Sequence, residues 1–264
     1  MKPKYFDIHS HLYFPEYDTD HNDVLKRMID SDVGTITIGT NLETSKKAIE
    51  TTTWSEYIYA SVGFHPADLD PKEKVSITDL KTLLEHKKVV AIGECGLDFF
   101  RLIGDEIEQK IKKDFQKQIF EEHIQLAVET KKPLMIHCRA AYPDMIDILS
   151  SKKREYGDTL RAHFHFFTES IETARKILDM GFTVSFTGVI TFVSDYKELV
   201  SFVPLESMMS ETDAPFVAPM PYRGKRNEPA YVMEVIQRIA DIKGISKDIV
   251  SETLRNNVSR VFGV

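Results

Sequence analysis

The chain has 264 residues, of which 42% are hydrophobic and 28% are charged, and its formal net charge is −7. This composition is ordinary for a folded globular protein and excludes a collagen-like or low-complexity chain. The acidic balance also excludes passive binding of nucleic acid, because phosphate affinity comes chiefly from many lysine and arginine contacts. A nucleic-acid role would therefore need a local basic patch, a bound metal, or both.

Targeting and redox signals are scarce in the sequence. No stretch approaches the roughly 18 consecutive apolar residues that a membrane span needs, and the first residues do not form a signal-peptide pattern. The two cysteines, Cys95 and Cys138, are too few for a disulfide framework. We therefore expect one domain over residues 1–264 in the cytoplasm, without a membrane partner.

Apolar, β-branched runs alternate with amphipathic helical patterns along the whole chain. The predicted strands cover residues 5–9, 35–39, 58–63, 89–94, 134–137, 160–165, 183–186 and 207–211. Helical patterns between them cover residues 22–31, 45–53, 77–86 and 108–130, and a last apolar stripe lies within 232–240. Eight strands alternating with helices favour a (β/α)8 TIM barrel, with an open parallel sheet as the alternative.

Histidines and acids recur where the predicted strands end. His9 and His11 are two residues apart on the first strand, so both side chains lie on one face and supply half of a divalent-metal site. In such a barrel the carboxyl ends of the strands meet at one face, where chemistry gathers. The remaining candidates at these ends are His65, Glu94, His137, His165 and Asp213. The pattern predicts a metal centre at the carboxyl ends of the strands.

The two acids in this set have different predicted roles. Glu94 follows an apolar strand, and its two carboxylate oxygens can each bind one ion, so it can bridge two metals. Asp213 is interpreted as a metal ligand and general base that accepts the proton of a water. Glu211 lies two residues earlier on the same face and is an alternative to Asp213.

Three further choices concern histidines and cysteines. His163 and His165 share one face of the sixth strand, and we expect His165, nearer the carboxyl end, to reach the metal. His65 lies on a loop and is expected to contact substrate rather than metal. Cys95 and Cys138 each follow a candidate ligand directly, so they turn to the opposite face and are expected to be inert thiols.

Cationic side chains lie in the predicted loops on the carboxyl-end side. Arginine can hold a phosphate through two parallel hydrogen bonds. We expect phosphate contacts from Arg139, Arg223 and Arg226, and Lys225 and Arg101 are further candidates.

Taken together, these motifs resemble those of the TatD family of metal-dependent hydrolases, and the resemblance covers essentially the whole chain. The opening DIHSH at 7–11 is similar to the family's D-x-H-x-H. The later matches, in chain order, are GFHP at 63–66, GECGLD at 93–98, HCR at 137–139, ETDAP at 211–215 and RGKRNEP at 223–229. Each motif is short, but the ordered series is specific.

One motif departs from the family pattern. The family reads H-x-F-S/T-G after the sixth strand, whereas this chain has HFFTE at 165–169. The match selects His165 over His163. Glu169 replaces the family's glycine, so the backbone of that turn is expected to differ.

The resemblance implies a barrel fold, a divalent metal centre and phosphodiester hydrolysis of DNA, often by removal of nucleotides from a 3′ end. The hypothesis is a binuclear site with His9, His11, Glu94 and Asp213 on one ion and Glu94, His137 and His165 on the other. Asp213, Glu94 and His65 would then be catalytic. The ligand set admits Zn, Mn, Mg, Co or Ni, and the expected substrate is single-stranded DNA or a 3′ end.

Two other functions are compatible with such a ligand set. An amidohydrolase-type barrel would hydrolyse a small ester, lactone or amide. Those enzymes often bridge their metals with a modified lysine, and Glu94 in that position favours the nuclease. The other alternative is a non-catalytic metal-dependent binding protein, which would have no need of a general base such as Asp213.

Overall fold

The computed structural model describes residues 3–100 and 102–264, and over these residues eight strands form one sheet in the order of the sequence. Each neighbouring pair is parallel. The strands are β1 (Tyr5–Ser10), β2 (Val33–Ile38), β3 (Ile58–Val62), β4 (Val89–Asp98), β5 (Leu134–Arg139), β6 (Ala162–Phe164), β7 (Thr183–Phe186) and β8 (Met208–Ser210). All eight predicted strands are present.

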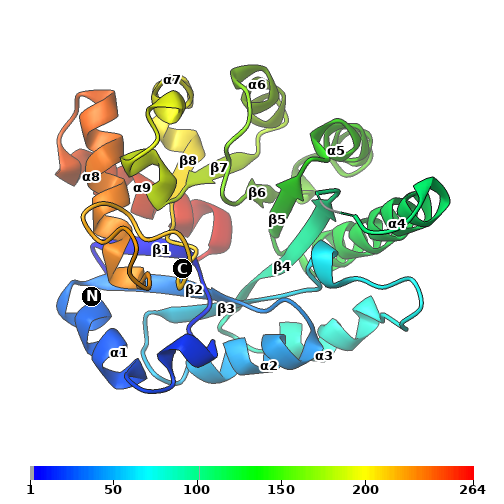
Figure 1. Cartoon of the computed structure of the whole chain (residues 1–264), viewed down its shortest axis with the longest axis horizontal. Helices are drawn as coiled ribbons and strands as arrows, with labels where there is room; N and C mark the ends of the chain where they lie inside the picture. Colours follow the sequence, from blue (N-terminus) through cyan, green and yellow to red (C-terminus); the bar gives the residue numbers. More distant parts are fainter. Residues whose placement is uncertain (1–2, 101) are drawn as a thin grey trace.

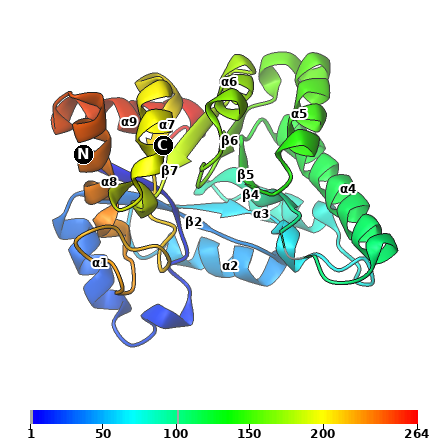
Figure 2. The same ribbon diagram turned by 45° about the horizontal axis from the view of Figure 1, so that its top comes forward.

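Helices follow the strands and lie around the outside of the sheet, as Figure 1 and Figure 2 show. They are α1 (His21–Asp30), α2 (Leu42–Thr51), α3 (Lys81–Leu84), α4 (Glu106–Thr130), α5 (Tyr142–Tyr156), α6 (Ile171–Asp179), α7 (Lys197–Phe202), α8 (Val232–Lys243) and α9 (Lys247–Phe262). This alternation of strand and helix is the one that the apolar periodicity predicts.

The sheet closes through the segment that follows β8. Ser10 and Ala214 form a parallel bridge, and the His11 N–H donates to the Ala214 carbonyl over 2.8 Å. The Asp213 N–H donates to the His9 carbonyl over 2.9 Å. These bonds join the last strand to the first, which confirms the (β/α)8 barrel and excludes the open sheet.

Local signals explain where several helices begin and end. Asn41 and Thr44 form a reciprocal capping box at the start of α2, and Asp105 and Glu108 form another at the start of α4. Gly244 takes a left-handed conformation with φ of 68° and ends α8.

The predicted helix over residues 77–86 is only partly correct. The chain forms a 3₁₀ turn at Ile77–Leu80 and then the single turn of α3. The helix stops because the chain turns into β4, and the Val89 N–H donates to the His86 carbonyl over 2.9 Å.

Buried apolar side chains form two clusters. The larger one joins the helices to the outer side of the sheet. The smaller one joins β1, β2, β4, β5 and β8 to the end of α9, where Phe262 is buried. The interior of the barrel is therefore a packed core.

Two irregularities in the sheet coincide with candidate ligands. The register of β1 on β2 shifts between Asp7 and Ser10, and that of β4 on β5 shifts between Ile92 and Cys95. Such bulges bend a strand and redirect its side chains. His9 lies within the first shift and Glu94 lies within the second.

No helix in the described part of the chain is long and apolar enough to cross a bilayer.

Candidate metal centre

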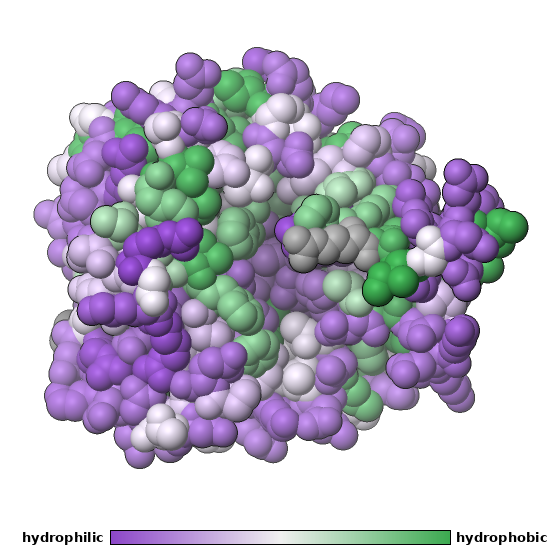
Figure 3. All heavy atoms as spheres, viewed as in Figure 1, coloured by the Kyte–Doolittle hydropathy of each residue, from purple (hydrophilic) through white to green (hydrophobic). Residues whose placement is uncertain are grey.

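A cavity of about 690 Å³ opens at the carboxyl ends of the strands. In the space-filling view the surface is hollowed near its middle, with hydrophilic residues at the bottom of the hollow and hydrophobic ones along its sides (Figure 3). The lining includes seven of the predicted site residues: His11, His65, Glu94, His137, Arg139, His165 and Asp213.

Glu94 lies at the centre of this group. Its Oε1 atom is 2.8 Å from Nε2 of His165, 3.1 Å from Nδ1 of His137 and 3.3 Å from Nε2 of His65. Its Oε2 atom is 3.4 Å from Nε2 of His9. The two oxygens of one carboxylate thus contact imidazoles that arrive from different strands.

Asp213 lies close to both histidines of the first strand, His9 and His11. Its Oδ1 atom lies 3.6 Å from Nε2 of His9 and 3.6 Å from Nε2 of His11. Within the described residues, three sets of side chains have ligand atoms that all lie within 4.8 Å of one another. These sets are His9, His11 and Asp213; His65, Glu94 and His137; and His9, His165 and Glu211.

Hydrogen bonds identify which nitrogen of two histidines faces the cluster. The Nδ1 atom of His11 lies 3.1 Å from the Ile38 carbonyl, which can only accept, so Nδ1 carries the proton. The Nε2 atom of His137 lies 2.9 Å from Oδ2 of Asp98 and donates to that carboxylate. In the neutral rings, the form that binds a cation, the lone pairs are therefore on Nε2 of His11 and on Nδ1 of His137, and both face the carboxylates of the cluster. Burial alone would lower the pKa of His137, but Asp98 and Glu94 raise it to about 9, so without a cation both of its ring nitrogens carry protons.

The orphaned atoms of the cluster fit a cation. Both ring nitrogens of His9 and Nδ1 of His165 are buried without a hydrogen-bond partner. A buried polar atom left unpaired costs about 1–3 kcal/mol. A divalent ion facing Nε2 of His9 would satisfy one of these atoms. Neutral imidazoles mixed with carboxylates form a donor set that suits Zn, Mn, Co or Ni.

The pKa values of the site follow from burial and neighbouring charge. Burial lowers the pKa of His9 to about 4, since a charged imidazole would lose its hydration. Burial alone would raise the pKa of Glu94, but the imidazoles of His165, His65 and His9 outweigh it and hold that pKa well below its usual range. His9 is thus neutral and Glu94 ionised, the forms in which both bind cations.

His65 differs from the other histidines in its tautomer. Its Nδ1 atom accepts the Ala67 N–H over 3.1 Å, so in the neutral ring the proton is on Nε2. That Nε2–H faces Oε1 of Glu94. Neutral His65 therefore presents a hydrogen-bond donor to the cavity, whereas neutral His11 and His137 present lone pairs.

The structure also locates three further residues that the sequence offered as possible ligands: His163, Cys95 and Cys138. His163 lies within β6 with both ring nitrogens engaged, Nδ1 with Thr183 at 2.7 Å and Nε2 with Ser185 at 2.8 Å, so it has no free ligand atom. Cys95 is buried away from the cavity, and Cys138 lines it without joining any of the three sets. Both thiols have raised pKa values because of burial.

Glu169, which replaces the family's glycine, is exposed and does not have a positive φ. Its backbone therefore needs no glycine. The left-handed residue of this turn is Phe166, with φ of 48°.

The structure separates the three arginines that were expected to contact phosphate. Arg139 lines the cavity, and its guanidinium stacks on the ring of Phe100 at 3.8 Å. Arg223 lies over the ring of Phe192 at 3.9 Å and is not among the lining residues.

Arg226 and Lys225 do not line the cavity either. Arg226 pairs with both carboxylate oxygens of Asp20 at 2.7 Å and with Glu228 at 3.2 Å, so its charge is already neutralised within the fold. Lys225 is exposed and does not line the cavity. Arg101 lies outside the described residues.

Sequence reasoning did not assign a role in orienting the ligands to two neighbouring acids, Asp98 and Glu211. Asp98 belongs to the GECGLD segment and holds His137, yet the sequence segment alone does not show that contact. Glu211 was considered only as a competitor of Asp213, and it lies behind His9 and His165. The signal for both was their spacing, since each is an acid within four residues of a candidate ligand.

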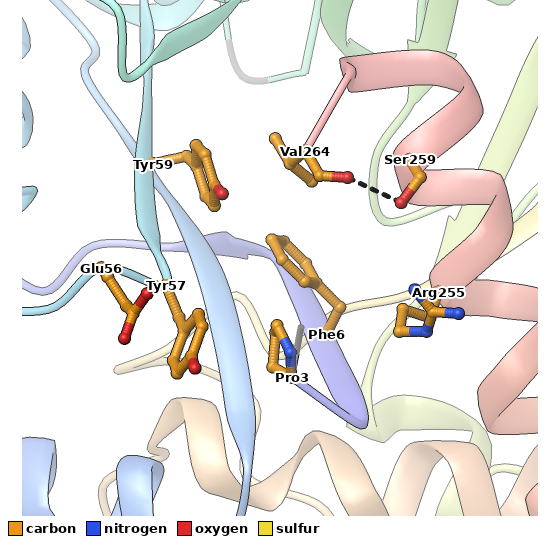
Figure 4. Close-up of a pocket in the computed structure, with 8 residues that line it drawn as sticks. All are labelled: Pro3, Phe6, Glu56, Tyr57, Tyr59, Arg255, Ser259 and Val264. Atoms are coloured by element: carbon orange, nitrogen blue, oxygen red, sulfur yellow. Dashed lines mark hydrogen bonds between the residues drawn. The ribbon is translucent and has the colours of Figure 1, made fainter. Parts of the chain in front are cut away.

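A second pocket, of about 340 Å³, lies at the amino ends of the strands. Phe6, Tyr57 and Tyr59 form its aromatic part, and Arg255 of α9 faces them across it (Figure 4). None of its lining residues belongs to the three ligand sets. The three ligand sets lie at the opposite end of the barrel.

A (β/α)8 barrel with a cluster of buried histidines and carboxylates at its strand ends defines the class of barrel metal-dependent hydrolases. Comparisons with known proteins give the family. The model of the family described as TatD related DNase matches residues 6–263. The chain belongs to the TatD family and is a metal-dependent hydrolase.

Relatives of this chain span its full length. An uncharacterized metal-dependent hydrolase of Bacillus subtilis, YabD, is 37% identical over 98% of this chain and 99% of its own. YcfH of Escherichia coli, described in the same words, is 34% identical over 98% and 95%. The crystal structure of YjjV, a TatD homologue from Escherichia coli, matches with a TM-score of 0.87 at 27% identity and covers 100% of both chains.

Proposed function

We propose that this hydrolase cleaves phosphodiester bonds in DNA, as a 3′–5′ exodeoxyribonuclease that uses two divalent ions. The observation that carries the proposal is the position of Glu94, whose Oε1 lies 3.1 Å from His137 and whose Oε2 lies 3.4 Å from His9. A carboxylate with one oxygen toward each of two imidazole groups fits a bridging ligand. The family description as TatD related DNase supports DNA as the substrate class.

The residues divide between two ions. His9, His11, Glu94 and Asp213 would hold one, and Glu94, His137 and His165 the other. When bound, two such ions supply positive charge that stabilises a phosphoryl group and lower the pKa of a water.

The protein groups around the ions would orient the substrate and move the proton. Asp213 accepts the proton of the attacking water on its carboxylate. His65 donates its Nε2–H to a phosphate oxygen or to the leaving oxygen, consistent with the tautomer that Ala67 imposes. Arg139, held against Phe100, contacts a neighbouring phosphate.

Arg223 and Arg226 are not included among the phosphate contacts. Arg226 is paired with Asp20 and Glu228, and neither arginine lines the cavity. The cavity volume of about 690 Å³ is within the range of pockets that bury small ligands. The end of a DNA strand fits such a site better than an intact duplex, so we propose single-stranded DNA or 3′ ends as substrate. We also propose that residues 1–264 act as one cytoplasmic domain.

The test is digestion of single-stranded DNA labelled at its 5′ end, with added Mg²⁺, Mn²⁺ or Zn²⁺ and with a chelator. A ladder of products shortened from the 3′ end, abolished by chelator, supports the proposal. Internal cuts would refute the exonuclease mode but keep the nuclease. Turnover of lactones or amides without DNA cleavage would favour the small-molecule hydrolase, and no turnover at all would favour a binding protein.

A further inference from the structure

Each neutral imidazole that gives one nitrogen to a cation keeps its proton on the other nitrogen, and that N–H needs an acceptor. His11 and His137 have theirs, the Ile38 carbonyl at 3.1 Å and Asp98 at 2.9 Å. His9 and His165 do not: the Nδ1 atom of each is buried and unpaired.

The unpaired atoms of both histidines face one carboxylate oxygen. The Nδ1 atom of His9 and the Nδ1 atom of His165 each lie 3.8 Å from Oε2 of Glu211. That oxygen is itself buried and unpaired. The two rings are stacked, with centroids 4.0 Å apart and planes 12° apart, and both present Nδ1 toward Oε2 of Glu211.

Glu211 is held in place from its other side. Its Oε1 atom accepts the Phe166 N–H, and its own N–H donates to the Phe186 carbonyl over 3.1 Å. The side chain is fully buried. Oε2 is thus left with two free lone pairs, one for each histidine.

We propose that Glu211 is a positioning residue shared by both metal sites. With the cations bound, Oε2 would accept the Nδ1–H of His9 and the Nδ1–H of His165 once each 3.8 Å separation shortens to hydrogen-bond distance, so one carboxylate orients a ligand of each ion. This proposal rests on the metal ligands assigned under the proposed function, but it does not depend on the substrate being DNA.

The same three side chains could instead surround a further cation, since their ligand atoms lie within 4.8 Å of one another. That arrangement would attach both imidazoles to cations through both nitrogens, and each ring would have to lose its remaining proton. An acceptor role for Glu211 keeps both imidazoles neutral and is favoured for that reason.

The first test uses the wild-type protein loaded with Zn²⁺, which permits NMR. Long-range ¹H–¹⁵N correlation spectra, assigned with His9→Gln and His165→Gln, report the tautomer of each ring. The proposal expects an Nδ1–H on both histidines, shifted downfield by a hydrogen bond to a carboxyl oxygen. An Nε2–H on either ring, or no ring proton, would overturn it.

The second test is Glu211→Gln, which keeps the size of the side chain and replaces one carboxyl oxygen with an amide NH₂ group. We expect Zn²⁺ affinity at both sites to fall 10- to 100-fold, measured by competition with a chromophoric chelator, with the number of bound ions unchanged at saturation. Glu228→Gln is the matched control, because Glu228 is a buried carboxylate that pairs with Arg27 away from the cluster. Its affinity should equal that of the wild type.

The remaining outcomes distinguish failure of the positioning role of Glu211 from failure of the proposed nuclease function. Unchanged affinity in a folded Glu211→Gln protein overturns the positioning role, and loss of one whole ion shows that Glu211 is itself a ligand. If Glu211→Gln does not fold, the tautomers of His9 and His165 in the wild-type spectra still support or overturn the proposal. If the protein binds metal as described but leaves DNA intact, only the proposed function fails.

Discussion

Asp98 holds the imidazole of His137 on the side that faces away from Glu94: Oδ2 of Asp98 lies 2.9 Å from Nε2, and Nδ1 lies 3.1 Å from Oε1 of Glu94. This contact turns His137 so that Nδ1, rather than Nε2, is the available ligand atom. The main chain of Asp98 is held in turn by Gln116 of α4, through bonds of 2.8 and 3.0 Å.

Asp98→Ala should therefore weaken metal binding by about 10- to 100-fold while the protein stays folded, because His137 loses the acceptor that orients it. Isothermal titration with Zn²⁺ measures the change. The control is Asp70→Ala, which removes an exposed acid of a nearby loop. Equal losses in both variants would mean that general negative charge, and not the contact to His137, sets the affinity.

Metal removal should destabilise the wild-type protein more than the His9→Ala variant. A ligand present at 100 times its Kd stabilises the folded state by about 2.7 kcal/mol. Neither ring nitrogen of His9 has a hydrogen-bond partner, so His9→Ala breaks no such bond and should leave the fold largely intact. Thermal unfolding with and without chelator gives both values. His9→Ala should also lose most turnover, and full nuclease activity in that variant would discredit the metal assignment.

His123 should make stability depend on acid. It is buried in α4, accepts the Phe64 N–H at Nε2 over 3.2 Å and donates from Nδ1 to the Ile119 carbonyl over 2.8 Å. Burial lowers its pKa from 6.5 to about 4. As the pH falls below 6.5, the unfolded chain gains a proton that the folded protein does not take up, so stability decreases.

The contribution of His123 to this loss is about 3 kcal/mol between pH 6.5 and 4, and it vanishes above pH 6.5. In urea unfolding at several pH values, His123→Gln should flatten the profile in this window. His86→Gln, at an exposed histidine, is the matched control. A profile for His123→Gln parallel to that of the wild type contradicts the prediction.

Gly96→Ala should disturb the site through the backbone. Gly96 has φ of 136°, and an added Cβ would lie 2.0 Å from the His137 carbonyl oxygen. The clash pushes β5 away from β4, so we expect destabilisation of at least about 2 kcal/mol and weaker metal binding. Gly181→Ala is the control, because its φ is 78° but a Cβ there meets nothing within 4 Å. The denaturant midpoints of the two variants are compared: Gly181→Ala measures backbone strain alone, and Gly96→Ala measures backbone strain together with the steric clash.

Arg139→Ala should raise the KM for DNA about tenfold with little change in kcat, since its guanidinium lies at the cavity and is exposed. A tenfold change corresponds to about 1.4 kcal/mol of binding. Arg223→Ala should leave KM unchanged, because Arg223 lies over Phe192 and outside the lining. Similar effects of both variants would point to diffuse electrostatic attraction in place of a specific contact.

Much of the site could be anticipated from the order of residues along the chain. In a parallel barrel all strands point the same way, so residues that end successive strands meet at one face. On this ground the sequence predicts that Glu94 and Asp213 lie close together. It worked because it needed only strand positions, which apolar periodicity reveals.

Sequence reasoning was weaker where contacts depend on partners far away. Arg226 lies in a motif that suggested phosphate binding, yet it is paired with Asp20, which is 206 residues away along the chain. Alternation on a strand places His9 and His11 on one face, but it does not reveal the register shift around His9 or the one around Glu94. Both register shifts depend on which residues pair across neighbouring strands.

By itself, the sequence determined the barrel and the set of side chains at its open end, because periodicity and chemistry are local properties. Only the tertiary structure decided which nitrogen of each imidazole faces the cluster, through acceptors such as Asp98 and the Ile38 carbonyl. The physical reason is that a tautomer is chosen by the hydrogen bond at the far side of the ring. That partner comes from another strand, so its position exists only in the folded chain.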